Sequence, residues 1–135
     1  MIKMSTNESL KERRLAFLNE TISHFNSKNR AYDKERQACS YSHKVNGGCA
    51  IGRKVSAELA EEFEAMSRAQ EQNAGLSVGA TDIFKKLPTE LQELGSYFLE
   101  LVQSLHDGDI YWDENGLSRI GEKKVENIKA QLELN

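Results

Sequence analysis

The sequence predicts a single domain over residues 1–135 of the α+β class, predominantly α. Four to five helices are expected around a central helix at about 88–106, with one β-hairpin at about 38–53. Apolar residues recur at helical spacing along most of the chain, and one stretch around Gly47 and Gly48 alternates with a period of two. Charged residues make up 29% of the chain, as is common for domains whose helices expose one polar face.

The first two helices are predicted from apolar stripes with polar residues between them. One is expected over roughly 8–27, facing the core through Leu10, Phe17, Leu18, Ile22 and Phe25. The second is expected over about 57–72, opened by Ser56 and facing inward through Leu59, Ala60, Phe63 and Met66. A short helical piece is expected over 81–86.

The central helix at about 88–106 has the strongest apolar stripe in the chain. Pro88 suits its first turn and Gly108 suits the position after its last. Its inward residues are expected to be Leu91, Leu94, Phe98, Leu101, Val102 and Leu105. A short strand is expected at 110–112, followed by a last helix at roughly 119–133 that Ser118 caps and that faces inward through Ile120, Val125, Ile128 and Leu132.

The predicted hairpin rests on a register argument. The side chains expected to face the core are at odd positions, namely Cys39, Tyr41, His43, Val45, Cys49 and Ile51. A two-residue turn at 46–47 would set odd residues opposite even ones, whereas a three-residue loop pairs 45 with 49 and 43 with 51. The loop places a left-handed residue last, and Gly48 adopts that conformation without steric cost.

Charge and hydropathy patterns exclude several protein classes. The net charge of −3 gives no indication that the partner is a nucleic acid or an anionic membrane surface. No apolar run approaches the ~20 residues of a membrane span, and the N-terminal residues lack the apolar core of a signal peptide. A cytoplasmic protein is expected, with its two cysteines reduced.

Metal ligands of the zinc type occur in the hairpin, as Cys39, His43 and Cys49. In the expected register Cys49 lies opposite Val45, and Cys39 lies six residues further along the Val45 strand, about 20 Å away at roughly 3.3 Å per residue. That separation excludes both a shared ion and a disulfide. Small buried thiols are therefore expected, with no metal and no cofactor.

Two further groups of residues can carry ligand chemistry. The His106-Asp107 pair can act in binding or proton transfer, or it can brace a helix end. Arg53 and Lys54 precede the helix start at Ser56, where an anion can bind, although a solvated strand end is the alternative. A pocket for a small phosphorylated ligand, such as a nucleotide, would combine Tyr41, His43, Arg53, Lys54, His106 and Asp107.

Three short motifs resemble those of small uncharacterised proteins of bacteriophages and prophages. They are Cys39-x-Tyr41, then Gly48-Cys49-Ala50-Ile51-Gly52, then Gln103-x-x-His106-Asp107 with Trp112 five residues on. The resemblance implies an accessory protein that acts inside a bacterial host cell. It also implies that the hairpin and the His106-Asp107 corner lie together.

The expected function is non-enzymatic, because the chain has no catalytic motif. A phage-type accessory protein would bind a host protein, with a defence or regulatory component as the expected target. Its contact surface would be the acidic helix face of Glu58, Glu61, Glu62 and Glu64. The alternative is a small-ligand or enzymatic module at the His106-Asp107 corner, and a homodimer is left open.

Overall fold

The computed structural model describes residues 9–74 and 80–134, which are mostly helical. The helices are α2 (Ser9–His24), α3 (Ala57–Ala74), α4 (Ala80–Ile83), α5 (Thr89–Gln92), α6 (Ser96–Asp107) and α7 (Arg119–Gln131). Single turns of 3-10 helix are η1 (Gly52–Lys54), η2 (Phe84–Lys86) and η3 (Asp109–Tyr111). Two antiparallel pairs join β1 (Tyr32–Asp33) to β2 (Ala38–Cys39) and β3 (Trp112–Asp113) to β4 (Gly116–Leu117). The predicted class is confirmed.

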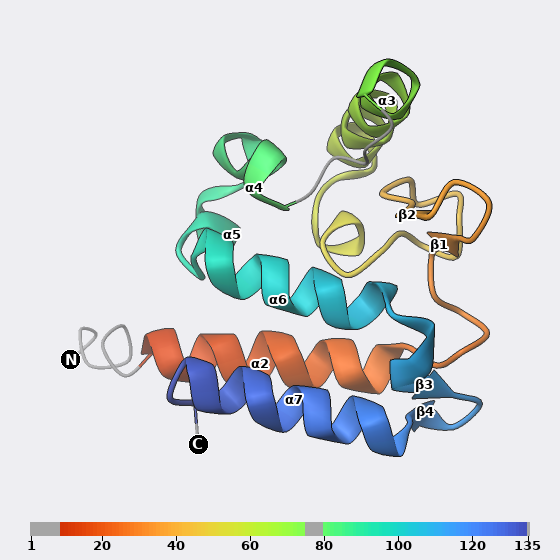
Figure 1. Ribbon diagram of the computed structural model, residues 1–135. Coiled ribbons are helices and arrows are strands. Elements are labelled where there is room, and N and C mark those ends of the chain that lie inside the picture. The colour runs from red at the N-terminus through yellow and green to blue at the C-terminus, as the bar shows by residue number, and fades with distance from the viewer. Residues whose placement is uncertain (1–8, 75–79, 135) are drawn as a thin grey trace.

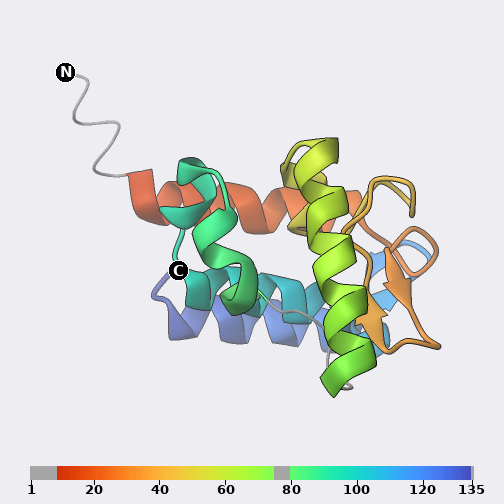
Figure 2. The ribbon, with the colours of Figure 1, turned by 90° about the horizontal axis from the view of Figure 1, so that it is seen from above.

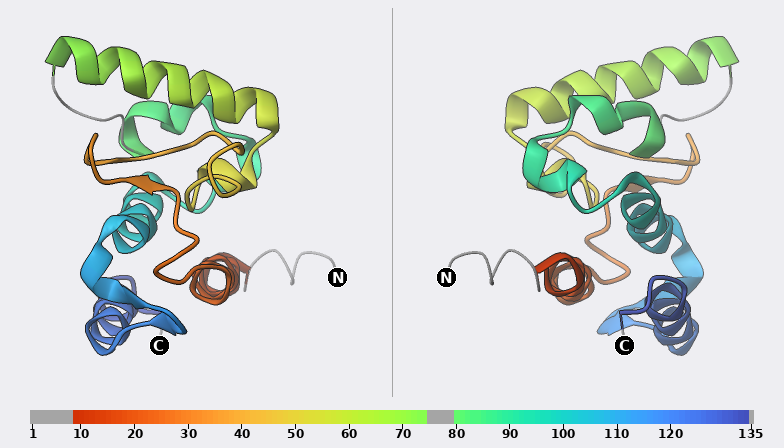
Figure 3. Two further views of the ribbon diagram at one scale, coloured as in Figure 1. Left: turned by 90° about the vertical axis from the view of Figure 1, so that its right-hand side faces the viewer. Right: turned by 90° about the vertical axis from the view of Figure 1, so that its left-hand side faces the viewer.

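Helices α2, α6 and α7 run alongside one another, and α6 contacts both of the others (Figure 1). Helix α3 runs across this group rather than along it, as the view from above shows (Figure 2). Seen end-on, the three helices form one side of the molecule, and α3 and α4 lie on the other side (Figure 3). The chain between β1 and η1 lies between these two parts, and its residues 38–42 and 48–52 are buried (Figure 3).

Helix α6 provides the centre of the core, as the apolar stripe predicts. Phe98, Leu99, Val102 and Leu105 are all fully buried, and the Phe98 ring meets the edge of Phe17 from α2 with centroids 6.0 Å apart. Burying such side chains is the main favourable contribution to folding, at about 1.5–3 kcal/mol each. Among the described residues, no helix has both the length and the apolar character needed to cross a membrane.

The predicted central helix at about 88–106 is interrupted. Gly95 has a φ of +93°, which separates the single turn of α5 from α6. The Arg14 guanidinium donates to the carbonyl oxygen of Leu94 at 2.9 Å, so an arginine from α2 satisfies a carbonyl at the break. Leu91 and Leu94 are nevertheless buried, because α5 turns their side chains toward the same core.

The hairpin lies earlier in the chain than the sequence predicts. Strand pairing joins Tyr32 to Cys39 and Asp33 to Ala38, whereas residues 43–47 and 50–51 of the predicted 38–53 hairpin form turns. The alternating pattern predicted a strand with one buried and one exposed side, but residues 38–42 are all buried. In addition, the amide of Tyr41 donates to the Glu64 carboxylate of α3 and is not available to a partner strand. Gly48 does have the predicted positive φ, at +96°.

An arginine–carboxylate network fixes α3 to the β1–β2 hairpin. The Arg36 guanidinium bonds both carboxylate oxygens of Glu71, at 2.8 and 2.7 Å, and also pairs with Glu64 at 3.3 Å. Two parallel bonds of this kind hold their partners in a defined geometry. The hydrogen bond from Arg36 lowers the pKa of Glu71 below its ordinary value of 4.5.

The C-terminal elements differ from the expected pattern in two details. The strand at 110–112 begins only at Trp112, because residues 109–111 form η3. Ile120 is 53% exposed, and the buried position in the first turn of α7 is taken by Gly121. A Cβ atom at Gly121 would lie 2.1 Å from the Tyr111 carbonyl oxygen, so only a glycine permits this close approach. Ser118 caps α7 as predicted, accepting from the Gly121 amide at 3.0 Å.

The close packing around Gly48 can be tested by comparing alanine substitutions at Gly48 and at Gly47. Both Gly47 and Gly48 have positive φ, but a Cβ at Gly48 would lie 2.9 Å from the Tyr41 carbonyl oxygen, whereas Gly47 has open space. We expect Gly47→Ala to cost about 1 kcal/mol from backbone strain, and Gly48→Ala about 2 kcal/mol more from overpacking. Urea unfolding of both variants measures the difference, and equal losses would contradict the close packing of this turn.

The Arg36–Glu71 pair predicts a pH dependence of stability. A carboxyl whose pKa is lowered by folding contributes stability above its unfolded value of 4.5, and that contribution is lost as the pH falls through the folded value. We therefore expect the difference in unfolding free energy between the wild type and Glu71→Gln to be constant at neutral pH and to shrink below pH 4.5. Glu62→Gln is the control, since its pair with Lys86 is about half exposed on both sides. A difference that persists in acid would exclude this ionic origin.

Candidate functional site

The segment after β2 is tied to α6 through one side-chain amide. Gln103 accepts a hydrogen bond from the Ile51 amide at 3.3 Å and donates to the Asp107 carboxylate at 3.0 Å. Gly52 permits the segment to fold back on itself, because a Cβ there would lie 2.4 Å from the Tyr41 carbonyl oxygen. The chain at 39–53 and the end of α6 are therefore fixed relative to each other.

His106 is fully buried and holds Asp107 in place. Its Nε2 accepts from the Ala31 amide at 3.2 Å, so the ring proton is on Nδ1, which donates to Asp107 Oδ1 at 2.7 Å. The edge of the ring also meets Phe25, with centroids 4.8 Å apart. The imidazole is thus a bracing group, and the residue of the pair that reaches solvent is Asp107, whose side chain is 32% exposed.

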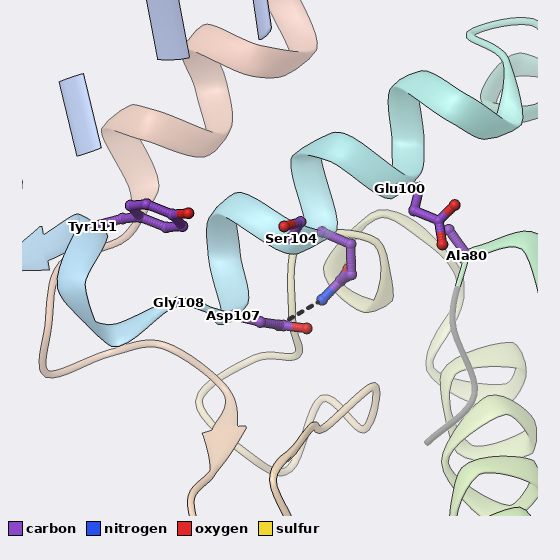
Figure 4. A pocket seen from close by; sticks show the side chains of 7 residues that line it. Ala80, Glu100, Ser104, Asp107, Gly108 and Tyr111 are labelled. Atoms are coloured by element: carbon purple, nitrogen blue, oxygen red, sulfur yellow. Dashed lines mark hydrogen bonds between the residues drawn. The ribbon is translucent and has the colours of Figure 1, made fainter. Parts of the chain in front are cut away.

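A pocket of about 380 Å³ opens beside the C-terminal half of α6, lined by Ala80, Glu100, Gln103, Ser104, Asp107, Gly108 and Tyr111. Glu100, Ser104 and Asp107 project from successive turns of the helix, and Tyr111 lies beyond its end (Figure 4). The Tyr111 ring can lie against the backbone there, since a Cβ at Gly108 would come within 2.6 Å of it. Two carboxylates and no cation are among the lining residues that the structure describes.

The two cysteine side chains lie together, in contrast to the separation of about 20 Å expected from an extended strand. The Cys39 thiol is within hydrogen-bonding reach of Cys49 and of the Tyr41 hydroxyl, and both cysteines are buried. The neighbouring thiol and burial raise the pKa of Cys39 well above its ordinary value. The predicted distance between the two cysteines was wrong because residues 42–48 turn back instead of forming an extended strand. Within the described ranges, no group of three His, Cys, Asp or Glu side chains could hold a metal ion.

The other residues proposed for a phosphorylated ligand do not reach this pocket. Tyr41 is fully buried, and burial raises the pKa of its phenol. His43 Nε2 contacts the Gly52 carbonyl oxygen at 2.7 Å. Arg53 and Lys54 both pair with Glu20, and the hydrogen bond from Lys54 lowers the pKa of that carboxyl. A single site combining all of these residues is therefore absent from the described part of the chain.

The acidic face expected on α3 is largely engaged within the molecule. Glu64 is 6% exposed and accepts from Tyr41, Arg36 and Arg68, so its assignment to a contact surface was wrong. Glu61 accepts from the Ser42 hydroxyl, and Glu62 pairs with Lys86 at 2.9 Å. Glu58 is exposed in the first turn of the helix.

Sequence reasoning identified Asp107 but missed most of the pocket lining. Positions 100, 103, 104 and 107 recur every three or four residues and are all polar or acidic. Such a stripe usually indicates a solvated helix face. The feature that distinguishes it is the burial of Gln103, a polar residue at 5% exposure, and this is visible only in the structure. Tyr111 has no such signal, because its position depends on the packing of α7.

The three short motifs noted in the sequence lie together in the structure. Gly48 and Gly52 both pack against the Tyr41 backbone, and Gln103 joins Ile51 to Asp107. The Trp112 indole donates to the Leu105 carbonyl oxygen at 2.9 Å. Comparisons of the chain with protein-family models, with curated proteins and with solved structures found no match. The phage-type family remains a prediction.

The bracing role of His106 predicts a large effect on stability. His106→Ala leaves a cavity and removes the partners of the Ala31 amide and of Asp107, so we expect a loss of about 3 kcal/mol. His24→Ala is the matched control, because that ring is exposed at the end of α2, and a loss under about 1 kcal/mol is expected. Denaturant unfolding measures both values. A His106→Ala variant as stable as the control would contradict the bracing role.

Proposed function

We propose that the chain is a non-catalytic binding protein whose pocket beside Asp107 takes a small cationic ligand, such as an amine or a guanidinium compound. The observation that carries this proposal is the geometry of Asp107. One carboxylate oxygen is held by His106 and Gln103, and the side chain reaches the pocket. A carboxylate fixed in this way loses little conformational freedom when a ligand binds.

The charge of the lining supports a cation over the phosphorylated ligand expected from the sequence. Glu100 is a second carboxylate on the same face of α6, and Ser104 adds a hydroxyl group. An anion in this pocket would face two negative charges, whereas Arg53 and Lys54 pair with Glu20 elsewhere. Hydrogen bonds between a cation and a carboxylate are about twice as strong as neutral ones.

A host protein as partner remains a prediction with less support. Three of the four carboxylates expected to form the contact surface are engaged with Arg36, Arg68, Lys86 or Ser42. A contact surface of this kind needs exposed carboxylates, and Glu64 is buried. The small-ligand alternative therefore takes precedence.

Amide NMR spectra of the full chain, titrated with agmatine, test the proposed function. Agmatine is a small cation with an amine at one end and a guanidinium at the other. We expect saturable shifts centred on residues 104–111 at millimolar concentrations, and no shift with succinate, an anion of similar size. Asp107→Asn should weaken binding by about tenfold, because it removes the negative charge while keeping the shape of the side chain.

The controls separate the pocket from general attraction to an acidic protein. Glu100→Gln should also weaken agmatine binding, whereas Glu126→Gln, on an exposed position of α7, should leave it unchanged. Equal affinity in the wild type, Asp107→Asn and Glu100→Gln would overturn the proposed function. If agmatine gave no saturable shift, the proposal that the pocket binds small cations would also be overturned.

A further inference from the structure

The fold brings together the only two cysteines of the chain, although nine residues separate them. Cys39 is 4% exposed and Cys49 is 0% exposed. Cys39 is held opposite Tyr32 by the β1–β2 pairing, and the Cys49 amide donates to the Ser40 carbonyl oxygen at 2.9 Å. These backbone bonds place the two residues on adjacent chain segments, with the Cys39 thiol within hydrogen-bonding reach of Cys49.

We propose that Cys39 and Cys49 form a reversible intramolecular disulfide, with a low-molecular-weight disulfide such as oxidised glutathione as the oxidant. Disulfide formation requires neighbouring chain segments with side chains directed toward each other, and both conditions are met here. This proposal does not rest on the proposed function, because the thiol–disulfide exchange requires no ligand in the pocket.

The exchange proceeds in two balanced steps. One cysteine, as its thiolate, attacks the sulfur–sulfur bond of oxidised glutathione, which gives a mixed disulfide and releases one glutathione thiolate. The second cysteine thiolate then attacks the mixed disulfide, which forms the Cys39–Cys49 bond and releases the second glutathione. Two thiols are oxidised, one disulfide is reduced to two thiols, and the cysteine protons pass to the released glutathione thiolates or to solvent.

Burial decides how fast this exchange occurs. The thiolate is the reactive form, and burial beside another thiol and near Asp107 raises the pKa of Cys39. Cys39 is 4% exposed and Cys49 is 0% exposed, so an oxidant reaches the thiols only when the surrounding chain opens. The site is therefore slow to oxidise and, once oxidised, slow to be reduced.

The test compares the thiol–disulfide equilibrium of the full chain in native buffer and in guanidinium chloride. The chain is equilibrated in mixtures of reduced and oxidised glutathione, starting from both the reduced and the oxidised protein, and is then quenched in acid. Mass spectrometry distinguishes the intramolecular disulfide, which has lost two hydrogen atoms, from mixed disulfides, which have gained glutathione. By linkage, the fold favours the disulfide by the same factor as the disulfide favours the fold.

We expect the equilibrium constant for the intramolecular disulfide to be about thirtyfold higher in the native protein than in the denatured chain. The oxidised form should unfold at a correspondingly higher denaturant concentration. Cys39→Ser and Cys49→Ser should give mixed disulfides only, and the comparison with the denatured wild type does not depend on how these variants fold. Equal constants in the two conditions, or mixed disulfides as the main native product, would overturn the proposal.

Discussion

The side-chain amide of Gln103 is the contact on which the rest of this structure depends. It accepts from the backbone of Ile51 and donates to Asp107, so one residue of α6 joins the irregular 39–53 segment to the helix end. Both amide atoms are satisfied inside the protein, which is the condition under which a buried polar group specifies one arrangement rather than destabilising the core. His106 adds a second support from the same turn by binding Ala31 and Asp107.

The helices could be predicted from the sequence because their signals are local. Helix α7 begins after the Ser118 cap, and the apolar stripe of α6 faces the core. The hairpin could not be placed, because the Tyr41 amide is bound by Glu64, which lies 23 residues away, and not by a partner strand. The break at Gly95 has a similar origin, since it is accompanied by an arginine from α2 that binds Leu94. Contacts between distant residues decided both cases.

The candidate site could be predicted only in part. His106-Asp107 stood out as a pair, but the sequence could not show that the imidazole is enclosed and the carboxylate is accessible. The cysteines were misplaced for the same reason as the hairpin, because a separation counted along a strand does not apply to a chain that turns back. Arg53 and Lys54 were expected to attract an anion, and Glu20 from α2 takes that position instead.

The close approach of Gly121 to Tyr111 has a consequence for the order of folding. The Ser118 amide donates to the Tyr111 carbonyl oxygen at 2.8 Å, the Ser118 hydroxyl donates to Ile110, and Lys124 lies 5.6 Å from the Tyr111 ring centre. Helix α7 contributes no residue to the pocket lining, yet it fixes the tyrosine at one end of it. During synthesis, α6 and its carboxylates emerge first, and the pocket is completed only when this later helix has docked.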